Sequence, residues 1–213
     1  MNVPPAPYAA RLDIDYPEHL DRFTTFFRVI WIIPIVIILG LLTATGNGTV
    51  ATESGEQIGS SGLGITAGLF VATALMIVFR ATYPRWWFNF GRELMRFEMR
   101  VGAYFLLLTD RYPSTVDEQS VHLEMDYPNV EQDLNRWLPL VKWLLAIPHY
   151  IVLVVLSLIA LVVSIIAWFT ILFTGRYPRG LFNYVVGVFR WGLRVTAYAF
   201  LLVTDQYPPF SLK

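Results

Sequence analysis

The sequence contains no cysteine. Disulfides, thiolate metal sites, iron–sulfur clusters and cysteine nucleophiles are therefore excluded. Charged residues are scarce as well, at 15% of the chain against about 25% in soluble domains. Sixteen Lys and Arg balance sixteen Asp and Glu, so no net positive field favours a nucleic-acid partner.

Familiar catalytic patterns are also missing from the sequence. It has no Gly-rich phosphate loop, no Gly-x-Ser-x-Gly, no His-Glu-x-x-His and no paired metal-ligand spacing. We therefore expect no cofactor and no metal site, and an enzyme is disfavoured.

Apolar residues make up 55% of the chain, and their long runs predict an all-α integral membrane protein. The runs place four transmembrane helices near 25–44, 63–81, 138–156 and 158–175. A Gly, Ser and Thr-rich stretch between the first two is expected to form an exposed loop. As one helix, residues 138–173 would measure about 54 Å, longer than a hydrocarbon core of about 30 Å. We therefore expect a reversal between Ser157 and Ser164; one long helix stays open, because no Gly or Pro marks a turn there.

The charges divide unevenly across four such spans. All sixteen Lys and Arg would lie on one side, and the other side would keep only Glu53 and Glu56. Because positive residues near spans are retained in the cytoplasm, we expect a multi-pass protein with both termini cytoplasmic.

The sequence also repeats itself. Residues 83–113 reappear at 177–208 with 17 of 31 aligned positions identical and one slipped residue at Ala199, and LDIDYP at 12–17 matches LEMDYP at 123–128. These matches predict two units, 1–115 and 116–213. Each unit would be a two-helix membrane hairpin followed by an amphipathic interfacial helix, with both units in the same orientation.

Basic and aromatic residues alternate after the second and fourth runs. Spacings of three and four align the arginines of 85–100 on one helical face, as expected for a helix in the cytoplasmic interface. We predict that the arginines bind anionic lipid headgroups; they are Arg85, Arg92, Arg96, Arg100, Arg179, Arg190 and Arg194. Two alternatives stay open. The arginines could pair internally, or each segment could be a third span, at about 2.5–3.5 kcal/mol per buried charge.

Two short segments alternate apolar and polar residues. Leu12–Asp15 and Val121–Asp126 have the period of half-buried strands. We expect them to be short cytoplasmic strands that pair with each other.

Three ionisable residues fall inside the apolar runs: Arg28, Lys142 and His149. They form a candidate intramembrane polar site, because ionisable groups at membrane depth often serve a pathway or a relay. The alternative is that the basic side chains snorkel to the interface and His149 satisfies a carbonyl freed by Pro148. Asp110 and Asp205, which precede Tyr-Pro turns, are either catalytic carboxylates or turn-forming residues.

The runs IPHYIVL at 147–153, AWFTILFTGRYPRGLF at 167–182 and LLVTDQYPPF at 201–210 resemble a bacterial integral membrane family, domain of unknown function 4389. The first half departs from this resemblance by carrying Ile35 where the second half has His149. The resemblance implies a multi-span protein of the bacterial inner membrane and brings no activity with it.

Together these patterns predict a non-catalytic membrane subunit or scaffold. Its partners would be membrane lipids and either a membrane protein or further copies of the chain. The alternative is a small channel or transporter built from the duplicated helices.

Overall fold

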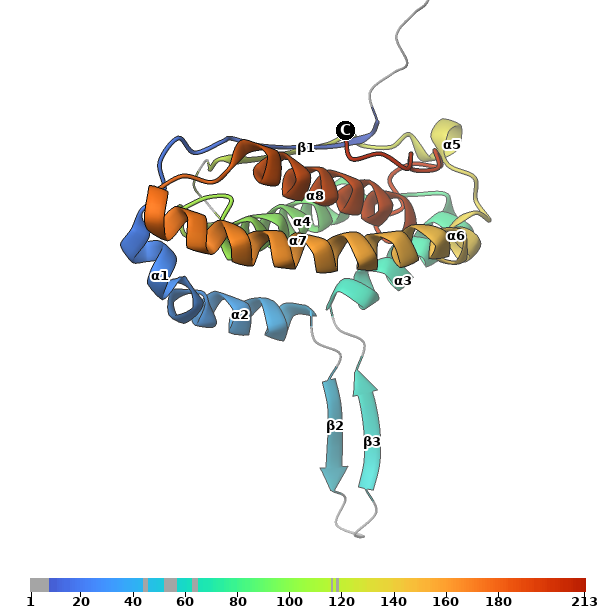
Figure 1. The fold of residues 1–213 in the computed structure, drawn as a ribbon. Coiled ribbons are helices and arrows are strands. Elements are labelled where there is room, and N and C mark those ends of the chain that lie inside the picture. Colours follow the sequence, from blue (N-terminus) through green and yellow to red (C-terminus); the bar gives the residue numbers. More distant parts are fainter. Residues whose placement is uncertain (1–7, 44–45, 52–56, 63–64, 116, 118) are drawn as a thin grey trace, which may run out of the picture.

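The computed structural model describes residues 8–43, 46–51, 57–62, 65–115, 117 and 119–213. The described chain is mostly helical (Figure 1). Its helices are α1 (Arg22–Trp31), α2 (Ile33–Thr43), α3 (Ile65–Arg80), α4 (Arg85–Phe105), α5 (Val130–Asp133), α6 (Pro139–Leu145), α7 (Ile147–Thr174) and α8 (Arg179–Ala199).

Two strands far apart in the sequence form a small sheet. β1 (Ala10–Ile14) pairs antiparallel with β4 (Val121–Met125), and Leu12 lies opposite Leu123. Alternate residues of both strands are buried, as the period-two pattern requires. The predicted pairing is confirmed.

The α8 helix lies between this sheet and α7. Figure 1 shows β1 along one side of α8 and α7 along the other. Val185, Leu193 and Ala197 of α8 have no exposed area. The predicted interfacial helix of the second half is therefore largely buried within the chain, because its more apolar sequence packs against β1 on one side and α7 on the other.

The α7 helix is continuous over Ile147–Thr174, so the expected reversal between Ser157 and Ser164 is wrong. The run contains neither Gly nor an internal Pro between 149 and 174, and nothing else interrupts its backbone hydrogen bonds. At 28 residues the helix is about 42 Å long. It ends at Gly175, whose φ of 73° allows the left-handed cap.

Prolines interrupt the regular hydrogen bonding of the apolar helices near their beginnings. The interruptions fall at Ile32, before Pro34, and at Ala146, before Pro148, and both residues keep right-handed helical dihedrals. Proline has no N–H to donate and its ring crowds the preceding turn. The expected spans 25–44 and 138–156 thus each contain an interruption near the proline, and backbone hydrogen bonds of Ile32 and Ala146 continue across it.

The stretch between α2 and α3 contains paired strands. β2 (Gly46–Ala51) and β3 (Gln57–Gly62) form an antiparallel hairpin that projects away from the helices, on the side opposite β1 (Figure 1). The sequence had predicted a loop here, and these residues instead form paired strands. Thr49, Val50 and Ile58 are β-branched and favour strands. Glu53 and Glu56 lie outside the described residues.

Among the described residues, two helical stretches are long and apolar enough to cross a membrane: Arg22–Gly40 and Ile147–Thr174. A shorter apolar helix covers Ala67–Arg80.

Candidate functional site

Arg28 is buried and neutralised inside the protein. Its side chain is 3% exposed and forms an ion pair with Asp110. Nη1 donates to the carbonyls of Tyr104 at 3.0 Å and Thr109 at 2.9 Å. The guanidinium also lies 4.5 Å from the centre of the Tyr104 ring, a distance at which cation–π attraction contributes.

Lys142 occupies a matching environment in the second half. It has no exposed area, its Nζ lies 2.7 Å from Asp205 Oδ1, and it donates to the Thr204 carbonyl at 2.8 Å. The ring of Tyr198 lies 5.2 Å away. Neither basic residue extends outward to a membrane interface. Both side chains are instead held inside the protein by an aspartate and a backbone carbonyl.

The two aspartates have a second structural contact each. Asp110 Oδ2 accepts from the backbone N–H of Asp21, the residue that caps α1, at 2.7 Å. Asp205 Oδ2 accepts from the N–H of Asn135 at 2.5 Å. Each carboxylate therefore contacts both a buried cation and the backbone of the segment that precedes the apolar helices, at Asp21 in the first half and at Asn135 in the second. The sequence does not predict these ion pairs, because each aspartate lies far along the chain from its cation, 82 residues for Arg28 and Asp110.

His149 is enclosed by aromatic side chains. Its Nδ1 accepts from Trp191 Nε1 at 3.0 Å, which places no proton on Nδ1. Its ring stacks on Phe210 at 4.0 Å and tilts against Tyr207 at 4.7 Å. Arg28, Lys142 and His149 therefore do not converge on one site: Arg28 faces Asp110, while Lys142 and His149 have separate partners.

The predicted headgroup arginines all have contacts within the described chain, and most of these contacts involve the sheet or the segments beside it. Arg190 donates to the Leu12 carbonyl at 2.9 Å and to Asp13 at 2.6 Å. Arg96 donates to Glu93 and to the Leu123 carbonyl. Arg100 and Arg194 donate to the carbonyls of Ser114 and Ser211, and Arg92 pairs with Glu93.

Arg85 and Arg179 differ from these. Both are exposed, and each guanidinium lies over a tyrosine ring, Tyr127 at 4.9 Å and Tyr16 at 4.6 Å. Contact with a ring face leaves the guanidinium donors available. The predicted headgroup arginines therefore fall into two groups: those that donate hydrogen bonds to other residues of the chain, and Arg85 and Arg179, which lie over tyrosine rings.

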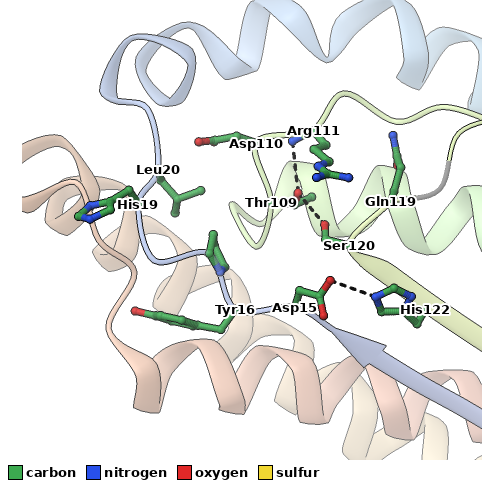
Figure 2. Close-up of a pocket in the computed structure, with 11 residues that line it drawn as sticks. Asp15, Tyr16, His19, Leu20, Thr109, Asp110, Arg111, Gln119, Ser120 and His122 are labelled. Carbon is green, nitrogen blue, oxygen red and sulfur yellow. Dashed lines mark hydrogen bonds and ion pairs between the residues drawn. The ribbon is translucent and has the colours of Figure 1, made fainter.

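A cavity of about 430 Å³, lined mostly by polar residues, lies beside Asp110 of the Arg28–Asp110 pair. Figure 2 shows Asp15 and His122 joined across it, with 3.0 Å between Oδ2 and Nε2. Ser120 Oγ donates to Thr109 Oγ1 at 2.9 Å. Asp110 and His19 also line the cavity. Both histidines are exposed, and the β1–β4 pairing brings His122 next to Asp15.

One comparison with known proteins gives a match. A family model described as Domain of unknown function (DUF4389) matches residues 137–211. The chain carries a DUF4389 domain there. No curated protein and no solved structure matches the chain.

The DUF4389 segment includes the second set of buried contacts. Lys142, His149, Trp191, Asp205 and Phe210 all lie within it. Its partner surface, β1 and the arginine contacts to Leu12 and Asp13, comes from the first half of the chain.

Proposed function

We propose that this protein is a non-catalytic integral membrane subunit or scaffold that binds lipids and a membrane protein partner. The observation that carries the proposal is the apolar surface of α1, α2 and α7. Ile151, Leu158 and Phe173 of α7 are 60% or more exposed, as are Val29 and Ile30 of α1. Soluble monomers rarely expose apolar patches larger than a few hundred Å², so lipid or another apolar surface has to cover these helices.

Matching contacts support a duplicated architecture. Arg28, Tyr104, Thr109 and Asp110 make the contacts that Lys142, Tyr198, Thr204 and Asp205 make. Leu107 and Leu202 both have positive φ, 66° and 56°. We infer that 1–115 and 116–213 are two copies of one unit, with the β1–β4 sheet as the contact between their equivalent strands.

The duplication also accounts for the different membrane helices of the two halves. By the sequence correspondence, α2 matches the first part of α7 and α3 matches the remainder. In the first half the β2–β3 hairpin separates the two parts. We propose that α1–α2 and α3 cross the membrane and place this hairpin on the side opposite the sheet.

The α7 helix is proposed to lie along the membrane instead of crossing it. Basic residues flank it at both ends, Lys142 before it and Arg176 and Arg179 after it. The positive-inside rule therefore favours both ends on the cytoplasmic side, and a continuous helix satisfies this only by lying flat. Its exposed face would then contact acyl chains while α8 covers the other face. In this arrangement both termini are cytoplasmic.

The arrangement of charge favours a scaffold over the channel alternative. Arg28 and Lys142, the cations deepest in the apolar helices, are each neutralised by an aspartate and enclosed. A conduction path needs polar groups that face water or a substrate.

Fractionation of bacterial membranes tests the proposal. Alkaline carbonate strips peripheral proteins, so the full chain is expected to stay in the membrane pellet, and its release would overturn membrane embedding. Purification in mild detergent then separates the two functions. A stoichiometric complex with another membrane protein supports the subunit, whereas a homo-oligomer that conducts ions in planar bilayers supports the channel.

A further inference from the structure

A second cavity, of about 330 Å³, opens on the apolar surface between α1, the end of α4 and α7. Its size is within the range of small-molecule sites. Most of its wall is apolar, and Val29, Ile165 and Phe169 at its edge are each more than half exposed. A ligand that enters from this surface therefore has to be apolar along most of its length.

The buried end of the cavity is polar. Thr25 has no exposed area and Arg28 is 3% exposed, and both line the cavity. Within the described chain, Thr25 Oγ1 and Arg28 Nε have no hydrogen-bond partner. Buried polar atoms are usually paired, so these two atoms indicate a missing acceptor at this end.

The charge at this end is already balanced. Arg28 forms its ion pair with Asp110 through Nη2, so an anionic ligand would add an uncompensated charge in an apolar site. A neutral acceptor such as an ester carbonyl can take a hydrogen bond from Arg28 Nε or from the Thr25 hydroxyl without that cost.

The other half of the chain shows what fills the equivalent place. Ser164 lines the cavity, and the repeat aligns it with Phe70. The Phe70 ring packs edge-on against Phe200 at 5.9 Å, and Phe200 aligns with Phe105 of the cavity wall. The smaller Ser164 side chain thus leaves open a space that the Phe70 ring fills at the equivalent position of the other half.

We propose that this cavity binds one acyl chain of a neutral acyl-ester lipid, with the ester carbonyl at Thr25 and Arg28. The site deepens the proposed lipid-binding function and rests on it, because the ligand enters from the bilayer. The cavity selects for a chain that ends in a neutral acceptor.

Native mass spectrometry of the full chain in detergent tests the site, with methyl palmitate, a neutral acyl ester, as the probe. Ser164→Phe fills the cavity with the side chain found at the equivalent position, and binding is expected to weaken about tenfold. Val162→Phe is the matched control, because it adds the same ring on the exposed face of the same helix and should leave binding unchanged. Equal binding by both variants and the wild type would overturn the proposal.

Two comparisons test the polar end. Thr25→Val keeps the shape and removes the hydroxyl, and it should weaken binding of the same probe about threefold to tenfold. Palmitate carries a free carboxylate in place of the ester and should bind less well than methyl palmitate. Tighter binding of palmitate would show that the site takes an anion and would overturn the neutral-ester assignment.

Fluorescence provides a measurement that does not depend on Ser164→Phe folding. Trp168 lines the cavity, so methyl palmitate with a brominated acyl chain should quench part of the wild-type emission, and Trp168→Phe should lose that part. Quenching that Trp168→Phe leaves unchanged would overturn the site. Carbonate extraction reports separately on membrane embedding, so failure of the cavity and failure of the proposed function are distinguishable.

Discussion

The ammonium of Lys142 lies 2.7 Å from Asp205 Oδ1, and the lysine side chain has no exposed area. Removing one partner of a buried pair leaves a charge that the interior cannot solvate. Asp205→Asn keeps an oxygen for the Asn135 N–H and removes the negative charge. We expect it to lower the free energy of unfolding by about 3–5 kcal/mol, measured by denaturation in detergent.

The matched control removes both charges. Lys142→Met combined with Asp205→Asn should be clearly more stable than Asp205→Asn alone, since no unpaired cation remains. A double variant as unstable as the single one would show that the ion pair is not the source of the loss.

We expect replacement of a hydrogen-bonded arginine and replacement of the two ring-contacting arginines to have opposite effects on stability and on lipid binding. Arg190 is tied to Leu12 and Asp13, so Arg190→Gln should cost about 1–3 kcal/mol of stability and leave co-purified anionic lipid unchanged. Arg85 and Arg179 contact rings and are exposed. Their double replacement by Gln should reduce bound anionic lipid, since each basic residue contributes about 1 kcal/mol near an anionic surface, and leave the unfolding midpoint nearly unchanged.

Thermal unfolding and lipid analysis of the same preparations measure both effects. Loss of anionic lipid in Arg190→Gln with an unchanged midpoint would contradict this division and make the inner arginines the headgroup ligands.

Glu98 gives the stability a pH dependence. Burial raises the pKa of this α4 carboxyl, so the folded state holds the proton more tightly than the unfolded state does. The resulting contribution of Glu98 to the free energy of unfolding is complete below the ordinary glutamate pKa and is lost as pH rises through the folded-state pKa. Glu98→Gln should therefore unfold at a higher temperature than the wild type at pH 7, with the difference shrinking towards pH 4. Glu93→Gln is the control, because Glu93 pairs with Arg92 and Arg96 on the surface and should not stabilise.

The sequence predicted the strands and helices that depend on the spacing of neighbouring apolar residues. The alternation in Leu12–Asp15 predicted a strand, and the repeat supplied its partner at Val121–Asp126; both follow from a period of two residues. The apolar runs predicted helices for the same reason. The interruption of these helices at Ile32 and Ala146 follows from Pro34 and Pro148, and could have been predicted from the prolines.

The site depended on contacts across the fold. Arg28 and Asp110 are 82 residues apart, and His149 and Trp191 are 42 apart, so no spacing in the sequence indicates that they meet. The predicted reversal within α7 was wrong for another reason: it was derived from membrane thickness alone, although this stretch contains no Gly or internal Pro that would end a helix.

Cysteine labelling decides how α7 lies, because the chain contains no native cysteine and each variant carries one thiol. Glu131 and Arg176 are exposed before and after the apolar α6–α7 region, and Glu18 is exposed near the sheet. If α7 lies along the membrane, a membrane-impermeant maleimide should label Glu131→Cys, Arg176→Cys and Glu18→Cys from the cytoplasmic side. Ser60→Cys in β3 should be labelled only from the opposite side. Labelling of Glu131→Cys and Arg176→Cys from opposite sides would mean that α7 crosses the bilayer, and the two halves would then differ in orientation.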